Sequence, residues 1–212
     1  MTDFSEARER MVTRQIVGRG IRSSAVIRAM REVPREAFVD ASLQDSAYAD
    51  SPLPIGAGQT ISQPYIVAYM IEALRLGDEA RVLEVGTGCG YAAAVLSRVA
   101  GTVHTIERHG QLARAARATL QRLGYHNVTV IEGDGSNGWP PAAPFDGIVV
   151  AAGSTEVPRS LSDQLAVGAC LVMPVGPSAS DQRLVRITRT GEHRFEREDL
   201  LPVSFVPLVS GA

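Results

Sequence analysis

Three acidic residues, Glu84, Glu107 and Asp134, each fall within or just after a short apolar run. An acid at a strand end can accept hydrogen bonds from both hydroxyls of a ribose, and a further acid could accept one from an adenine amino group. Any one of the three could instead be a surface, cap or turn residue. Three acids at successive strand ends are harder to explain in that way. The pattern therefore predicts a nucleoside-binding site.

A glycine-rich stretch, VLEVGTGCGY (82–91), contains the first acid. Gly86, Gly88 and Gly90 have G-x-G-x-G spacing, one residue tighter than the dinucleotide pattern, and backbone without Cβ can approach a ligand closely. All 21 basic residues are arginine, which excludes a phosphate-binding lysine. Glu84 would repel a diphosphate but could pair with a cation. We therefore expect S-adenosyl-L-methionine, which has an amino group and a sulfonium, rather than ATP or NAD.

A polar stretch, GQTISQPY (58–65), places two hydroxyls, Thr60 and Ser62, before a proline. Ser62 could be the N-cap of a helix with Pro64 in its first turn, and the letters alone favour this interpretation. A helix N-terminus is also an anion site, because its amides are free and its dipole end is positive. Both roles can hold together. Our hypothesis is that Ser62 orients an acceptor carboxylate and is not a covalent nucleophile.

Short apolar runs alternate with helical stretches from residue 81 onwards. The runs are RVLEV, VHTIE, VTVIEGD, DGIVVAA and ACLVMPV, and the helical stretches include 109–123 and 158–166. Such runs are typical of strands buried on both faces, and their alternation with helices indicates a parallel sheet with right-handed crossovers. Alternating polar and apolar residues after Val175 predict an antiparallel hairpin at a sheet edge. The expected fold is α/β, a mostly parallel doubly wound sheet.

The sequence of the N-terminal third predicts helices, in contrast to the alternating strands and helices after residue 81. Helical spacing covers residues 4–17, 24–32 and 64–75, with Ser24 as a cap of the second helix. Proline and glycine in residues 51–59 predict a loop. We expect one α/β domain that carries an N-terminal helical cap.

Composition limits the partners of the chain. Of 212 residues 45% are hydrophobic, and the formal net charge of −2 offers no field for nucleic acid or an anionic membrane. Cys89 and Cys170 have neither metal-ligand nor disulfide spacing, and the charged N-terminus is no signal peptide. We expect a cytoplasmic monomer without a metal, in which neither the cysteines nor the histidines are catalytic.

Several longer strings resemble the protein-L-isoaspartate (D-aspartate) O-methyltransferase family over nearly the whole chain. The glycine motif is common to many methyltransferases, whereas GQTISQP and REVPREAFV are far more specific. The strings are RMVTRQIVGRGI (10–21), AMREVPREAFV (29–39), YADSPLPIGAGQTISQPYIVAYM (48–70), VLEVGTGCGY (82–91), GDG (133–135), FDGIVVAAG (145–153), MPVG (173–176) and VSFVPL (203–208).

The resemblance implies a Rossmann-like class I methyltransferase that uses S-adenosyl-L-methionine. Its acceptor would be the free α-carboxyl of L-isoaspartyl residues in damaged proteins and peptides, and repair would follow through a succinimide. Ser62 is implied as the active-site residue. The implied cofactor contacts are Gln59, Thr60, Ile61, Ser62, Glu84, Gly86, Gly88, Gly90, Glu107, Asp134 and Gly135. The implied substrate contacts are Thr60, Ser62, Ala152 and Val206.

The same resemblance divides the single domain, 1–212, into three segments. Residues 1–76 would form the helical cap and acceptor-side loop, 77–175 the cofactor-binding core, and 176–212 the hairpin and peptide-cleft segment. One departure lies near the acceptor: GSTEVP (153–158) stands where a small residue and proline are usual.

Three alternatives remain open from the sequence. The chain could methylate a carboxyl of a dedicated peptide or a small molecule. It could also be a non-catalytic S-adenosylmethionine-binding module, although such a module would not need the acceptor-side GQTISQP. A dinucleotide oxidoreductase is disfavoured by the glycine spacing.

Overall fold

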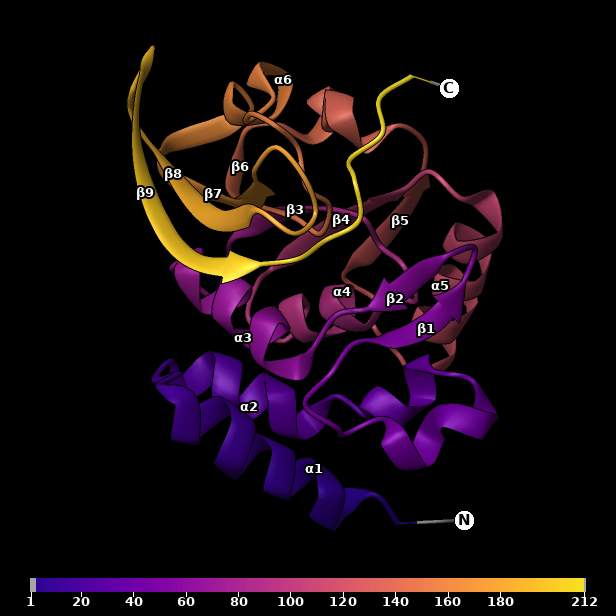
Figure 1. The fold of residues 1–212 in the computed structure, drawn as a ribbon. Helices are drawn as coiled ribbons and strands as arrows, with labels where there is room; N and C mark the ends of the chain where they lie inside the picture. The colour runs from indigo at the N-terminus through magenta and orange to yellow at the C-terminus, as the bar shows by residue number, and fades with distance from the viewer. Residues whose placement is uncertain (1–2, 212) are drawn as a thin grey trace.

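A seven-stranded sheet forms the centre of the computed structural model, which describes residues 3–211 (Figure 1). The strand order is β5-β4-β3-β6-β7-β8-β9. Neighbours from β5 to β7 pair in parallel, whereas β8 is antiparallel to both β7 and β9. The bounds are β3 Arg81–Val85, β4 Thr102–Glu107, β5 Val128–Glu132, β6 Phe145–Val150, β7 Leu165–Val175, β8 Gln182–Gly191 and β9 Arg194–Val203. The predicted parallel sheet with an antiparallel C-terminal hairpin is confirmed.

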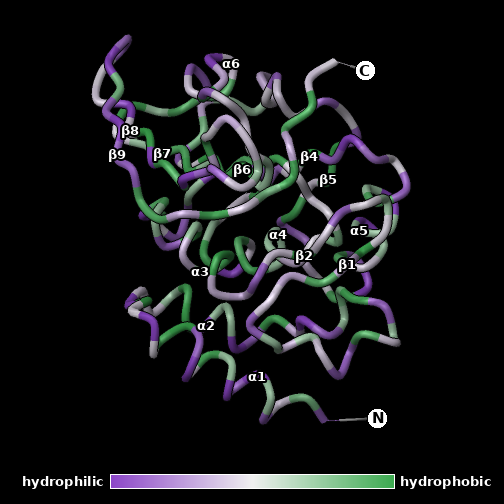
Figure 2. The backbone as a smooth tube through the Cα atoms, in the orientation of Figure 1, coloured by the Kyte–Doolittle hydropathy of each residue, from purple (hydrophilic) through white to green (hydrophobic). Residues whose placement is uncertain are grey.

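The parallel strands are apolar throughout because both faces of the sheet are covered. Val82 and Leu83 are neighbours in β3 and are both 0% exposed, yet they belong to separate hydrophobic clusters. Side chains alternate between the two faces of a strand, so each face needs its own apolar residues. Strand β9 lies at the edge of the sheet and is polar over much of its length, in contrast to β7 (Figure 2).

Helices form the two layers over the sheet and an additional N-terminal layer. Helix α2 packs on α3 and α4, and α1 lies further from the sheet (Figure 1). The α-helices are α1 Ser5–Met11, α2 Ser24–Glu32, α3 Pro64–Ala73, α4 Tyr91–Leu96, α5 Gly110–Arg122 and α6 Arg159–Ser162. Helix α1 continues as a π-helix, Val12–Ile16, and a 3₁₀ turn, Val17–Arg19. Further 3₁₀ segments are Arg35–Phe38, Ala41–Ser46, Gly135–Asn137 and Pro140–Ala142. Within residues 3–211, no helix has the length and apolar character needed to cross a membrane.

Three local predictions differ from the structure. The segment 51–59 is not simply a loop, because β1 (Leu53–Gly56) pairs antiparallel with β2 (Gln59–Ile61). Ala57 and Gly58, with φ of 50° and 68°, form the tight turn that a two-residue hairpin requires. Helix α2 covers the predicted residues, but Ser23 and not Ser24 is its N-cap. The helix predicted over 158–166 is only the short α6, since β7 already begins at Leu165.

Candidate active site

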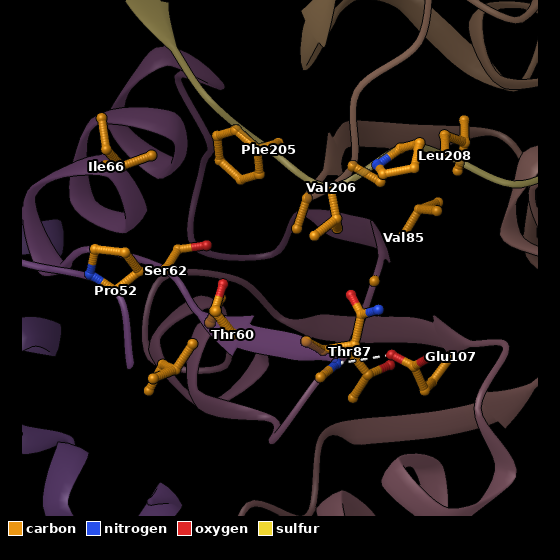
Figure 3. A pocket seen from close by; sticks show the side chains of 18 of the residues that line it. Pro52, Thr60, Ser62, Ile66, Val85, Thr87, Glu107, Phe205, Val206 and Leu208 are labelled. Atoms are coloured by element: carbon orange, nitrogen blue, oxygen red, sulfur yellow. Dashed lines mark hydrogen bonds between the residues drawn. The ribbon is translucent and has the colours of Figure 1, made fainter. Parts of the chain in front are cut away.

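A cavity of about 890 Å³ opens where β3, β4 and β6 end (Figure 3). Strand β3 lies between β4 and β6, so the chain order changes direction here, at the point where open α/β sheets bind ligands. Most of the predicted site residues line this cavity. They are Gln59, Thr60, Ile61, Ser62, Gly86, Gly88, Glu107, Gly135, Ala152 and Val206. Glu84, Gly90 and Asp134 do not line it.

The glycine loop between β3 and α4 depends on left-handed backbone. Gly86, Gly88 and Gly90 have φ of 96°, 54° and 92°, values that other residues rarely adopt. A Cβ at Gly86 would lie 3.3 Å from that of Ala151. A Cβ at Gly90 would instead meet Leu120 at 3.2 Å, which explains why this glycine serves packing against α5 and not the cavity wall. The first two glycines therefore present bare backbone to a ligand.

Glu107 ends β4 and fastens the glycine loop from the side. Its Oε2 accepts from the Gly88 amide at 2.9 Å, and its Oε1 accepts from the His109 amide at 2.9 Å. The residue is only 5% exposed, and its carboxylate lies at the cavity (Figure 3). A carboxylate has about four lone-pair sites, so it can still accept from a ribose while holding both amides.

Glu84 lies behind the loop and away from the cavity. The Thr105 hydroxyl donates to Glu84 Oε2 at 2.5 Å, and the Thr87 and Thr105 hydroxyls are 2.6 Å apart. Burial raises the pKa of the Glu84 carboxyl to about 8, although the Thr105 hydrogen bond opposes the shift. At neutral pH this group is therefore largely protonated. The sequence expectation of a carboxylate paired with the cationic end of a cofactor does not match this position.

Asp134 also stands beside the cavity and not on its wall. Its carboxylate accepts from the Ser136 amide at 2.9 Å and from the Gly211 amide at 2.8 Å. Partial burial raises the pKa of Asp134, but the hydrogen bonds from Gly211 and Ser136 outweigh it and the pKa is lowered. The adjacent Gly135 does line the cavity, where a Cβ would lie 2.4 Å from Cγ1 of Val85.

The hydroxyls of Thr60 and Ser62 point into the cavity from β2 and the residues after it (Figure 3). The cap role predicted for Ser62 is wrong. Helix α3 begins at Pro64, so its N-cap is Gln63, which makes no side-chain cap bond and donates instead to Asp50 Oδ1 at 2.8 Å. Within residues 3–211 the Ser62 hydroxyl makes no hydrogen bond, which leaves it available to a ligand.

The opposite wall is the C-terminal strap, residues 204–208, which follows β9 and crosses the cavity mouth (Figures 1 and 3). Phe205 and Leu208 line the cavity beside the predicted Val206. Sequence reasoning named neither of them individually, although both stand in the quoted VSFVPL string. Pro52 and Ile66, also on the wall, carried no chemical signal that could have singled them out.

A model of the protein-L-isoaspartate(D-aspartate) O-methyltransferase family matches residues 6–212. The chain belongs to this family. It is 61% identical over 208 residues, 98% of this chain and 85% of the relative, to protein-L-isoaspartate O-methyltransferase 1 of Rhodopseudomonas palustris (strain HaA2).

Two solved structures resemble the fold. One, a protein-L-isoaspartate O-methyltransferase, has a TM-score of 0.87 at 30% identity and covers 96% of this chain and 66% of that one. The other, at TM-score 0.80 and 24% identity over 99% of both chains, is a putative protein-L-isoaspartate O-methyltransferase from Plasmodium falciparum in complex with S-adenosyl-L-homocysteine. The chain therefore has the class I methyltransferase fold and is a methyltransferase.

The cofactor of the isoaspartate methyltransferase family, S-adenosyl-L-methionine, fits the site. Bare backbone at Gly86 and Gly88 allows close approach of a nucleoside, and the Glu107 carboxylate is held at the same edge. The cavity continues from there to the Thr60 and Ser62 hydroxyls, which leaves room for an acceptor. Among residues 3–211 there is no group of three or more His, Cys, Asp or Glu that could hold a metal ion.

Proposed function

We propose that this chain methylates the free α-carboxyl of L-isoaspartyl residues in damaged proteins and peptides, with S-adenosyl-L-methionine as the donor. One observation carries the proposal: a single cavity joins a nucleoside-type wall, Gly86–Gly88 and Glu107, to the hydroxyl of Ser62, which has no hydrogen-bond partner among residues 3–211. Membership in the family supports the substrate class. The methyl ester would then close to a succinimide, whose hydrolysis partly restores normal aspartate.

The chemistry asks for little acid–base help from the protein. A carboxylic acid of pKa about 4 is already ionised at neutral pH, so no general base is needed. The bound cofactor supplies an electrophilic methyl group on a sulfonium. The side chains of the site have to align the two reactants and exclude water from between them.

Ser62 is the residue to which we assign orientation of the acceptor. Its hydroxyl can donate one hydrogen bond to a carboxylate oxygen, and Thr60 offers a second hydroxyl on the same side of the cavity (Figure 3). The N-terminal end of α3 begins two residues later, and its dipole favours a negative charge nearby. Both effects hold the acceptor carboxylate without forming a covalent bond to the protein.

The remaining wall residues serve binding and water exclusion. Glu107 and the backbone of Gly86 and Gly88 would hold the nucleoside, while Phe205 and Val206 of the C-terminal strap cover the acceptor with apolar surface. Cys89 lines the cavity, but burial raises the pKa of its thiol to about 11. A protonated thiol is a poor nucleophile, so a cysteine-linked intermediate is disfavoured.

The deciding experiment compares two peptides of one sequence that differ only in an isoaspartyl or a normal aspartyl linkage. With radiolabelled S-adenosyl-L-methionine, we expect base-labile methyl ester on the isoaspartyl peptide alone. Equal labelling of both peptides, or labelling of neither, would contradict the proposal and favour a dedicated peptide or small-molecule acceptor.

We also propose that one domain, acting as a cytoplasmic monomer, carries the activity through three segments. Residues 1–76 would provide the helical cap and acceptor hydroxyls, 77–175 the cofactor site, and 176–212 the peptide-cleft wall. The contribution of all three to one cavity supports this division. Sedimentation at assay concentration should give a species near 22.6 kDa. A measured mass of twice this value would contradict the proposal that the protein is a monomer.

A further inference from the structure

The side chain of Gln182, the first residue of β8, forms hydrogen bonds with the main chain of the C-terminal strap. Its Oε1 accepts from the Phe205 amide at 2.7 Å, and its Nε2 donates to the Phe205 carbonyl at 3.3 Å. The residue is 5% exposed and does not line the cavity. A primary amide that both donates to and accepts from one residue imitates a strand neighbour, so it continues the ladder beyond β9, which ends at Val203.

The next anchor of the C-terminal strap is Gly153, which follows β6. The Gly153 amide donates to the Val206 carbonyl at 2.8 Å, and the Leu208 amide donates to the Gly153 carbonyl at 2.7 Å. Gln182 therefore holds Phe205, whereas Gly153 holds Val206 and Leu208, and all three of these strap residues line the cavity (Figure 3). The two anchors hold successive residues of the cavity wall.

There is no room for a side chain at Gly153, because the Gln182 amide occupies that space. A Cβ at Gly153 would lie 2.0 Å from Nε2 and 2.7 Å from Cδ of Gln182. The φ of Gly153 is not among the positive values, so alanine would suit the backbone and would displace only the glutamine. This gives a physical reason for glycine at position 153.

We propose that Gln182 is a positioning residue for the peptide acceptor. It acts through the Phe205 backbone to keep the acceptor-side part of the C-terminal strap in its binding conformation, with Gly153 leaving room for its amide. This inference rests on the proposed function for its substrate. The two hydrogen bonds between Gln182 and the Phe205 backbone form a clasp. Loss of this clasp lets the C-terminal strap populate other positions, and the apparent affinity for the peptide falls in proportion to the fraction of protein in the binding conformation.

The first test replaces Gln182 by Met, which keeps length and apolar packing but removes both hydrogen bonds. We expect KM for the isoaspartyl peptide to rise about five- to thirtyfold, the range that one or two lost hydrogen bonds allow. The value of kcat and the Kd for S-adenosyl-L-homocysteine should change less than about threefold, since Leu208 keeps its own anchor. Gln121→Met, the same change on the exposed surface of α5, should leave all three unchanged.

The second test approaches the clasp from Gly153. Gly153→Ala should raise KM as Gln182→Met does, because its Cβ displaces the amide. In a Gln182→Ala background the colliding atoms are gone, so Gly153→Ala should add less than about twofold. Full additivity of the two effects would overturn the inference, because independent sites add and coupled ones do not.

A third measurement does not depend on the acceptor. Hydrogen exchange at the Phe205 amide should accelerate at least about tenfold in Gln182→Met, while the Leu208 amide should stay protected. If the wild-type protein ignores isoaspartyl peptides, the proposed function fails and this exchange result still tests the clasp. Unchanged exchange, or KM unchanged in a folded Gln182→Met with normal Tm, would refute the positioning role. If that variant does not fold, Gly153→Ala alone decides by the same KM and exchange criteria.

Discussion

Gly88 and Glu107 are joined by a hydrogen bond of 2.9 Å from the Gly88 amide to Glu107 Oε2. The bond connects the glycine loop after β3 to the end of β4, and the second oxygen of the same carboxylate holds the His109 amide. Because Glu107 also lines the cavity, one buried carboxylate both shapes the loop and faces the proposed ribose position. Loop geometry and cofactor affinity should therefore change together.

Glu107→Gln should weaken S-adenosyl-L-homocysteine binding by roughly 100-fold. The glutamine amide has only one acceptor oxygen, so its NH₂ group would face either the Gly88 or the His109 amide, and two donors cannot bond to each other. Titration calorimetry measures the Kd. The matched control is Glu132→Gln, at the exposed end of the neighbouring strand, directly opposite Glu107 in the β4–β5 ladder. Its Kd should stay within about twofold of wild type. If Glu107→Gln and Glu132→Gln changed the Kd equally, the assignment of Glu107 to the cofactor site would be wrong.

Ser62→Ala should lower kcat/KM for an isoaspartyl peptide by roughly ten- to a hundredfold, the effect of one hydrogen bond to a charged group. The Kd for S-adenosyl-L-homocysteine should change much less. Ser24→Ala, an exposed serine on α2, is the control and should be neutral. An unchanged kcat/KM would exclude the orienting role. A methyl- or acyl-serine adduct detected by mass spectrometry would replace it with covalent catalysis.

Glu84→Gln should change how stability depends on pH. The folded pKa of Glu84, about 8, lies above its ordinary value of 4.5, so the folded state holds a proton that the unfolded state releases. The free energy of unfolding of the wild type therefore falls as the pH rises from 4.5, the ordinary pKa, to about 8, the folded pKa. Above about pH 8 this contribution no longer changes. Glutamine is neutral throughout and avoids the loss, which is on the order of a few kcal/mol.

The measurement is urea unfolding of wild type and Glu84→Gln between pH 5 and 9, values chosen to span roughly the interval set by the two pKa values. The difference in unfolding free energy should grow in favour of the variant until about pH 8. Glu132→Gln, at an exposed acid, should track the wild type. A difference independent of pH would show that Glu84 is ionised in the fold.

Gly86→Ala should weaken S-adenosyl-L-homocysteine binding at least about tenfold and lower Tm. Alanine at a φ of 96° is strained by roughly 1–2 kcal/mol, and its Cβ would press on Ala151 at 3.3 Å. Gly77→Ala is the control, because its Cβ would meet nothing within 4 Å and its φ is not positive. Calorimetry and thermal unfolding would both have to show wild-type values for Gly86→Ala to refute the requirement for glycine.

Local patterns predicted the parts of the site that depend on neighbouring residues in the chain. The glycine loop after β3, Glu107 at the end of β4 and the polar stretch before α3 all lie at the cavity as expected. The reason is that parallel strands share an edge for their carboxyl ends, so residues that follow successive strands meet there. Membership in the methyltransferase family, expected from the motifs, is confirmed by the family match.

The misassigned residues were those whose side-chain direction decides the role. Glu84 lies inside β3, as the RVLEV run predicted, but its side chain points to Thr105 and not to the cavity. Ser62 stands one residue too early to cap α3, so its hydroxyl turns to the cavity (Figure 3). A shift of one position changes the face that a residue presents, and letters alone do not resolve such shifts.

By itself the sequence determined the fold class, the alternation of strands and helices from residue 81 onwards, the family and the cofactor edge, because these follow from periodicity, glycine spacing and motif strings within short segments. Only the tertiary structure decided which acid faces the cavity, that the Ser62 hydroxyl turns to the cavity, and what holds the C-terminal strap. The Gln182–Phe205 clasp joins residues 23 positions apart and needs the space left at Gly153 on another strand end. Contacts of this kind depend on how separate elements pack, and no local pattern encodes them.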